Sequence, residues 1–349
     1  MSASRDPMPS RIVAVADADR RLLDWAAEAA SAAVPRGIEA AVELARTLGE
    51  RVPSPGHGRT VDSLSVLATL GAIDLTVARV VEPHLDALAI LDQARERPGV
   101  GAYGVYAAER PGHEPVRATR DADGISLSGR KPWCSLAAGL DRALITATEG
   151  DARRLFDIDL HAPGAAAVTG TWVSRGLSGV DSGDLQLDHV RATAVGAAGW
   201  YLARPGFAWG GIGVAACWFG GAVGLARALL RSADRRRPDQ LALAAIGEAD
   251  RLLWAARSVL ADAAVRIDRG EAAGATGALL ADRVRGVVAG TAERILVLVG
   301  RALGPAPLTF DEEHARRVAD LTVYLRQHHA GRDDARAGSA VLATREEWA

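Results

Sequence analysis

Apolar positions recur with a helical period in the first and last parts of the chain and with a period of two in its middle. From Asp17 to about Arg97 they repeat at the three- and four-residue spacing of helix faces, as in Leu22, Trp25, Ala26, Ala29 and Ala33. From about Phe207 to near Ala337 this period returns over stretches long enough for a bundle of long helices. The pattern therefore predicts helices, then strands, then helices.

Strict alternation of apolar and polar residues marks the segment 101–199. Within it, the turn Asp121-Ala122-Asp123-Gly124 separates two alternating runs, and an Asp-Gly pair at such a place is a hairpin signal. We expect a compact, largely antiparallel β unit. The predicted fold class is α+β and multi-domain, with an N-terminal helical domain (1–99), a central β domain (100–199) and a C-terminal helical bundle (200–349).

One uncharged segment, from Pro205 to Ala226, is long enough to cross a bilayer. Its glycines and its flanking Arg204 and Arg227 favour a buried central helix instead. Inside it, GIGVAA (211–216) matches a dinucleotide-binding fingerprint, but that motif needs a strand before it and an acidic residue on the next strand. Both are missing from the pattern, so we expect these glycines to permit close helix packing.

Composition excludes several classes of protein. The net charge is −2, with 41 basic and 43 acidic residues, which argues against a nucleic-acid-binding protein. Two cysteines form no disulfide framework, and the opening segment MSASRDPMPSR has no apolar core of signal-peptide type, so we expect a short disordered lead, a cytoplasmic location and no membrane association. The eight histidines are scattered apart from His328 and His329, which point about 100° apart on a helix and make a poor metal pair. No metal site is expected.

The most informative run is AAERPGHEPVRATRDADGISLSGRKPWCSLA, residues 107–137. It contains an Ala-Glu-Arg-Pro-Gly turn (108–112), then the Asp-Gly hairpin, then Gly-Arg-Lys-Pro-Trp-Cys-Ser (129–135). In this order and spacing it resembles the start of the β domain of the acyl-CoA dehydrogenase family, where a Thr-Glu-Pro-Gly-like turn precedes a hairpin and Gly-x-Lys-x-Trp-Ile-Thr/Ser. The helix–strand–helix order extends the resemblance over most of the chain.

This resemblance implies an FAD cofactor and places it beside five residues. A flavin ring needs a flat apolar wall and hydrogen-bond donors at its edge. Trp133 would be the wall, the backbone N–H groups of Cys134 and Ser135 and the Ser135 hydroxyl would be donors, and the turn at Ala108 and Glu109 would line the flavin. The alternatives are that Trp133 is a core tryptophan in a strand, that the Ser135 hydroxyl has its hydrogen bonds satisfied within a strand, and that Cys134 is an inert buried thiol.

Members of this family also carry an arginine and glutamines in the C-terminal bundle that reach a neighbouring subunit's FAD. The comparable segment here is RRRPDQLALAAIGE (235–248), where Arg237 and Gln240 take that part. The phenylalanine and second glutamine of the family are missing, so a solvated, charged helix start is the alternative. The resemblance implies a homo-oligomer through these helices, or a hetero-oligomer with a related subunit.

The catalytic glutamate of the family is missing from both of its usual places. Near the C-terminus, Arg317 and Asp320 resemble a landmark that places the base near His328. The other usual place, the helix expected over 207–230, contains no acid. His328 is the candidate base because imidazole titrates near neutral pH. A surface or helix-capping histidine is the alternative.

Three functions remain open on the sequence. The first is FAD-dependent α,β-dehydrogenation of an acyl thioester, such as an acyl-CoA, or of a related carbonyl compound. The second is a flavin-dependent monooxygenase of the same fold, since such enzymes lack the glutamate. The third is a catalytically inactive partner subunit of a hetero-oligomeric dehydrogenase. No residues stand out as a site for the coenzyme A nucleotide.

Overall fold

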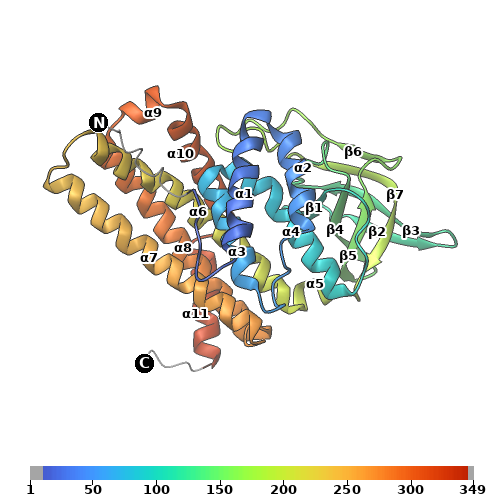
Figure 1. Ribbon diagram of the computed structural model, residues 1–349. Coiled ribbons are helices and arrows are strands. Elements are labelled where there is room, and N and C mark those ends of the chain that lie inside the picture. The colour runs from blue at the N-terminus through green and yellow to red at the C-terminus, as the bar shows by residue number, and fades with distance from the viewer. Residues whose placement is uncertain (1–10, 345–349) are drawn as a thin grey trace.

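The computed structural model describes residues 11–344, so residues 1–10 of the predicted N-terminal lead lie outside the described part (Figure 1). Its first helical layer precedes the strands. Asp19 begins the first helix by accepting hydrogen bonds from the N–H groups of Arg21 and Leu22, which a helix N-terminus leaves unpaired. The elements are α1 (Arg20–Ala33), the short η1 (Val34–Arg36), α2 (Ile38–Gly49), α3 (Thr60–Ile73) and α4 (Leu75–Ala94).

The central part is a sheet that closes on itself. Its path runs β1-β4-β2-β3-β7-β5 and returns from β5 to β4, with β6 attached to β7. The predicted hairpin is confirmed, because Asp121 of β2 lies opposite Gly124 of β3. The strands are β1 (Tyr103–Tyr106), β2 (Arg117–Asp121), β3 (Gly124–Lys131), β4 (Arg142–Glu149), β5 (Ala152–Asp159), β6 (Ala165–Ala167) and β7 (Leu185–Val195).

The largely antiparallel character is also confirmed, although two pairings are parallel. Strand β4 runs parallel to both β1 and β2, and the remaining pairs are antiparallel. A closed sheet leaves few unpaired edges and packs its inward-facing residues into one core.

After the strands come the helices of the C-terminal bundle. Helices α6, α7 and α8 are long and lie side by side at the end of the molecule opposite the sheet, with α3 packed against α6 (Figure 1). The elements are α5 (Trp200–Ala203), α6 (Pro205–Arg235), α7 (Gln240–Asp268), α8 (Gly274–Leu303), α9 (Ala306–Phe310), α10 (Glu312–Tyr324), η2 (Leu325–Gln327) and α11 (Gly331–Thr344).

Helix α6 is the central helix that the uncharged segment predicts. In the described part of the chain it is the one helix long and apolar enough to span a membrane, and 83% of its most apolar window is buried inside the protein. A Cβ at Gly224 would lie 2.7 Å from the carbonyl oxygen of Ala72, and one at Gly220 would collide with that of Ala68. Close helix packing is therefore what the glycines provide, and the dinucleotide-type motif lies in the middle of a helix.

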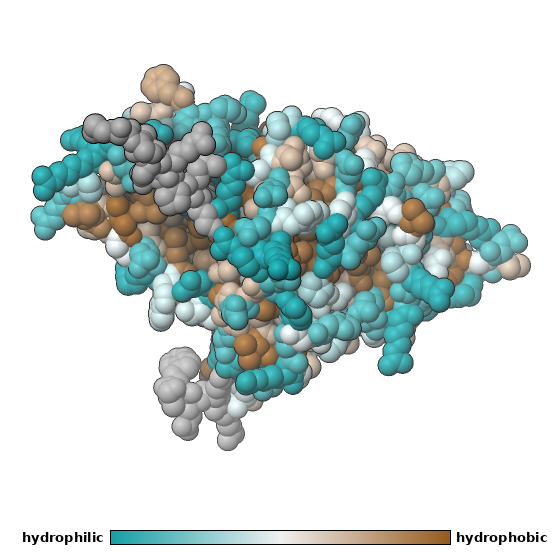
Figure 2. Space-filling view, viewed as in Figure 1, coloured by the Kyte–Doolittle hydropathy of each residue, from teal (hydrophilic) through white to brown (hydrophobic). Residues whose placement is uncertain are grey.

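The outer helices of the bundle keep apolar side chains at the surface. Figure 2 shows apolar side chains gathered over this end of the molecule, at the left of the view. A monomeric protein seldom exposes many large apolar residues along neighbouring elements. On α7 and α8 the exposed ones are Leu241, Leu243, Trp254, Val265, Val287 and Val297.

Candidate active site

The Trp133 side chain stands at the surface in an unusual backbone conformation. It follows the end of β3 with a φ of 60° and is 52% exposed, so it is not a core residue in a strand. A positive φ is uncommon for a bulky residue and is often found at functional sites. The guanidinium of Arg110 lies 5.8 Å from the centre of the indole. A flat apolar face is thus available at the position that the sequence predicts.

The backbone donors predicted at Cys134 and Ser135 are already used within the protein. Cys134 N–H donates to the carbonyl of Gly183 at 2.8 Å, and Ser135 N–H donates to that of Trp133 at 3.2 Å. These partners arise because the turn after β3 folds onto the segment before β7, and the role of the two N–H groups toward a flavin stays a prediction. Burial raises the pKa of the Cys134 thiol, which therefore stays protonated and inert.

The Ser135 hydroxyl joins the β unit to α4. It accepts a hydrogen bond from Arg79 at 2.9 Å and lies 2.8 Å from the hydroxyl of Ser182. Its carbonyl accepts from Tyr106 at 2.9 Å. Ser135 is therefore a loop residue with a charged partner, and the alternative interpretation, a hydroxyl within a strand, does not apply.

Glu109 lies above the chain's only lysine. Lys131 is fully buried and donates to Glu109 at 2.6 Å and to the Thr146 hydroxyl at 2.9 Å, while Arg153 lies 3.2 Å from the same carboxylate. Burial lowers the pKa of Lys131, and the Glu109 carboxylate opposes that shift. Glu109 compensates a buried charge, and Ala108 stands exposed beside it.

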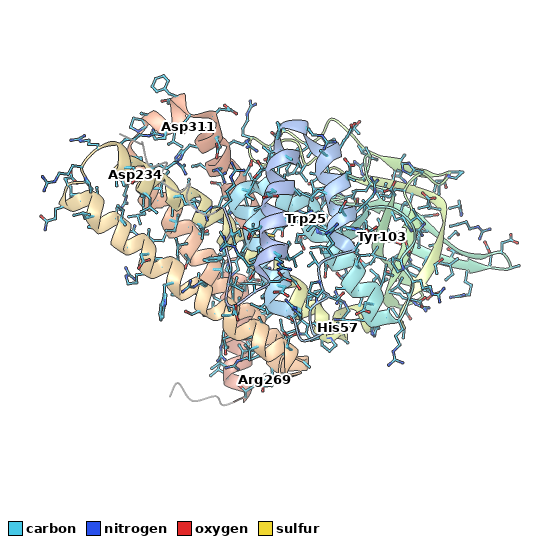
Figure 3. All side chains as sticks on the ribbon, viewed as in Figure 1. Trp25, His57, Tyr103, Asp234, Arg269 and Asp311 are labelled. Carbon is cyan, nitrogen blue, oxygen red and sulfur yellow. The ribbon has the colours of Figure 1, made fainter. Side chains whose placement is uncertain are left out.

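Arg237 and Gln240 lie far from these residues. Both are exposed at the turn between α6 and α7. Asp234, labelled near this turn in Figure 3, lies toward the end of the molecule away from Tyr103, which is labelled beside the sheet. Within one chain the structure does not bring Arg237 and Gln240 to Trp133.

His328 is an inward-facing histidine. Its side chain is 11% exposed, and its Nε2 atom is buried without a hydrogen-bond partner among the described residues. The nearest carboxylate oxygen, on Asp333, lies 3.7 Å away, and the ring meets that of Trp218 edge-on at 6.3 Å. Burial lowers the pKa of His328, so the imidazole is neutral near pH 7. The surface interpretation fits His329, whose side chain is 64% exposed.

Around His328 the structure assembles polar side chains that the sequence analysis missed. The Trp218 indole of α6 meets the Tyr324 ring of α10 at 6.3 Å, and Arg79 lies 5.9 Å from the centre of that ring. In the described part of the protein, Trp218 Nε1 is buried without a hydrogen-bond partner, and the buried Tyr324 hydroxyl makes no hydrogen bond of ordinary geometry although it interacts with Glu82. Buried polar groups are almost always paired, so three orphans in one place indicate a site for a ligand or ordered water.

Glu82 is the acid of this cluster. It lies on α4 at 3.7 Å from Arg79, and burial raises its pKa from the usual 4.5 to about 7. Asp86 raises this pKa further, while Arg79 and Arg285 lower it. The sequence did hold a signal, since Glu82 directly follows the apolar pair Val80-Val81 in α4, where a charge needs a structural or functional reason.

A pocket of about 710 Å³, its open mouth included, lies between α3, α4 and α6 and contains Glu82 in its wall. Three glycines on one face of α6, Gly206, Gly210 and Gly213, line it. A Cβ at Gly210 would stand 2.8 Å from the Asp86 carboxylate, so side chains on this face would fill the pocket. The lining is mainly apolar with a few polar groups, as is usual for small-molecule sites.

These features define the class of protein by its architecture. An N-terminal helical layer, a closed central sheet and a C-terminal bundle, in this order, constitute the acyl-CoA dehydrogenase-like fold. No protein-family model and no curated protein sequence matches the chain.

Solved structures match it over nearly its whole length. TdsC from Paenibacillus sp. A11-2, a dibenzothiophene monooxygenase solved with FMN and indole, superposes with a TM-score of 0.78 at 18% identity, covering 94% of this chain and 98% of that one. KijD3, with FMN and a dTDP-linked amino sugar, gives 0.74 at 18% identity over 93% and 92%. The nitrososynthase from Micromonospora carbonacea var. africana gives 0.75 at 18% over 92% and 95%.

Proposed function

We propose that this chain is a flavin-dependent monooxygenase acting on a small molecule held next to the flavin. One observation carries the proposal. Trp218, Tyr324 and His328 pack together and leave three buried polar atoms without ordinary hydrogen bonds, close to Arg79 and its partner Ser135. Structures of the same fold include a monooxygenase with bound FMN.

The residues at the end of β3 suit a flavin. Trp133 offers an exposed indole face, and the Ser135 hydroxyl and Arg79 supply a polar edge beside it. A bound flavin would supply two-electron transfer and the activation of oxygen. The sequence resemblance implies FAD, whereas the structural relatives TdsC and KijD3 hold FMN, so both are to be tested. Glu109 would keep the nearby Lys131 charge compensated.

The chain's own groups would position the substrate and move protons. Trp218 Nε1 and the Tyr324 hydroxyl donate hydrogen bonds to it, and neutral His328 accepts a proton or a hydrogen bond at Nε2. Glu82, with a pKa of about 7, exchanges a proton near neutral pH. The apolar walls of the adjoining pocket exclude water, which strengthens each of these interactions.

A second candidate function is α,β-dehydrogenation of an acyl thioester or related carbonyl compound. Glu82 favours it, because a buried carboxyl with a pKa near neutrality is suited to abstract a proton next to a carbonyl. In this case α4 supplies the base that the two usual positions lack. If the chain binds no flavin, the remaining candidate function is that of a catalytically inactive partner subunit.

We further propose that the chain forms an oligomer through α7 and α8. Their exposed apolar side chains are suited to pack against a second copy or a related subunit. Such an assembly could bring Arg237 and Gln240 to a flavin, because the turn between α6 and α7 lies away from the sheet of their own chain (Figure 1).

The test is an absorbance spectrum of the purified protein after gel filtration, with and without added FMN or FAD. We expect retained flavin bands, and we expect W133A and S135A to weaken retention while F310A, a substitution at an exposed residue of α9, leaves it unchanged. Oxygen consumption with reduced flavin supports the monooxygenase, and anaerobic bleaching by acyl thioesters supports the dehydrogenase. If the protein binds neither FMN nor FAD, the proposal that this chain alone is a flavoenzyme is refuted.

A further inference from the structure

Two carboxylates face the pocket from one side of α4. Glu82 and Asp86 are four residues apart, so they lie on the same helix face, and both line the cavity. Their nearest arginine nitrogens, from Arg79 and Arg204, stand 3.7 Å and 3.6 Å away. These distances exceed an ordinary hydrogen bond, although Arg204 still interacts with Asp86 and the Tyr324 hydroxyl with Glu82. The pocket therefore presents acceptors that can take a closer donor.

Beyond Asp86 the pocket continues into a groove at the surface. The two hollows share Pro55, Gln93, Arg204 and Trp209 in their walls, and the groove of about 540 Å³ adds Trp200 and His57. Figure 3 labels His57 at the lower edge of the molecule, where the groove opens.

The groove is suited to attract a positive charge. Its two tryptophans present π systems, which attract cations. The Asp92 carboxylate, 2.8 Å from His57, adds negative charge at the mouth. The route from the surface to Glu82 thus runs past two tryptophans, the Asp92 and Asp86 carboxylates and the Arg204 guanidinium.

Arg204 stands where the pocket and the groove meet. Its side chain is 2% exposed and donates to Gln93 at 3.0 Å, yet its Nε atom has no hydrogen-bond partner in the described structure. A buried guanidinium N–H that lacks an acceptor is costly. A ligand lying along α4 would meet two acceptors from Glu82 and Asp86 and one free donor from Arg204.

We infer that this pocket takes a small substrate with a protonated amine, held by Glu82 and Asp86, and with an oxygen acceptor for Arg204. The inference rests on the proposed function, because the amine would be the substrate of the flavin site. A carboxylate-bearing substrate is disfavoured by repulsion from the two acids. Burial raises the pKa of both carboxyls although Arg79 and Arg204 lower it, and a bound ammonium group would favour their charged forms further.

The test uses the full chain without flavin and a matched pair of probes, cyclohexylamine and cyclohexanol, in calorimetric titrations at pH 8. We expect the amine to bind about tenfold more tightly than the alcohol, since hydrogen bonds to charged groups are among the strongest. Asp86→Asn and Glu82→Gln should each reduce this preference about tenfold. Asp250→Asn removes the same charge from a different hollow, between α6 and α7, and should leave it unchanged.

Equal binding of the two probes by the unmodified protein overturns the inference. So does a preference for the amine that survives both substitutions. Circular dichroism checks that each variant is folded, and Glu82→Gln decides the matter if Asp86→Asn does not fold. Flavin retention is measured separately, so a protein that selects the amine but binds no flavin refutes the proposed function and leaves the amine site standing.

Discussion

Replacing Glu82 with glutamine should stabilise the protein, and the gain should depend on pH. In the folded chain the carboxyl holds its proton up to about pH 7, whereas in the unfolded chain it releases the proton near 4.5. Between these values the folded state binds more protons, so stability falls as pH rises. Below 4.5 both states are protonated and the carboxyl contributes nothing. Above pH 7 the full penalty of a buried carboxylate is present.

The size of this penalty follows from the two pKa values. At about 1.4 kcal/mol per pKa unit, the difference between 4.5 and about 7 corresponds to about 3 kcal/mol. Glutamine keeps the shape of the side chain and cannot ionise. We therefore expect Glu82→Gln to raise the free energy of unfolding by about 3 kcal/mol at pH 8 and by less than about 1 kcal/mol at pH 5.

Urea unfolding followed by circular dichroism at pH 5, 6, 7 and 8 measures this difference. Comparing the variant with the unmodified protein at each pH cancels the contribution of every other titrating group. Glu50→Gln, at an exposed position after α2, is the control and should follow the unmodified protein throughout. A gain that is the same at pH 5 and pH 8, or a loss at pH 8, would show that Glu82 is not a desolvated acid.

Three further predictions concern other parts of the structure. Gly220→Ala should destabilise the protein by about 2–4 kcal/mol, because the added Cβ would strike α3. Gly247→Ala, at a position of α7 with open space around it, should be neutral or stabilise the protein by up to about 1 kcal/mol, and thermal melts compare the two variants. Lys131→Met should cost about 1–3 kcal/mol in urea unfolding, because the buried carbonyl and hydroxyl of Thr146 lose a hydrogen-bond donor, and an unchanged midpoint would contradict this. Trp133→Ala should shift the melting temperature little, because the indole is half exposed; a large drop would mean that it is a structural residue.

Local patterns predicted the elements well. The Asp-Gly turn specified the β2–β3 hairpin, because that pair suits the backbone of a tight turn wherever it occurs. The glycines of α6 indicated close packing, because a missing side chain is useful mainly where two backbones meet. The position of Trp133 was also predicted, since the resemblance covers an unbroken run of residues.

The active-site cluster could not be predicted in the same way. Glu82, Trp218, Tyr324 and His328 come from four segments, and only the packing of α4, α6 and α10 brings them together. The partner of the Cys134 N–H group could not be predicted for a related reason. That partner, Gly183, belongs to a segment whose approach no local pattern reveals.

The two halves of helix α6 have different roles. Toward its C-terminal end, Gly220 and Gly224 touch the backbone of α3, so any added methyl group disturbs the packing of the domain. Toward its N-terminal end, Gly206, Gly210 and Gly213 face the cavity. A Cβ at Gly210 would meet the Asp86 side chain and one at Gly213 the Leu67 side chain, so exchanges here press on side chains that line the cavity, whereas Gly220 and Gly224 meet backbone. The N-terminal half of α6 can therefore change in evolution, and with it the range of ligands, while the C-terminal half keeps the fold.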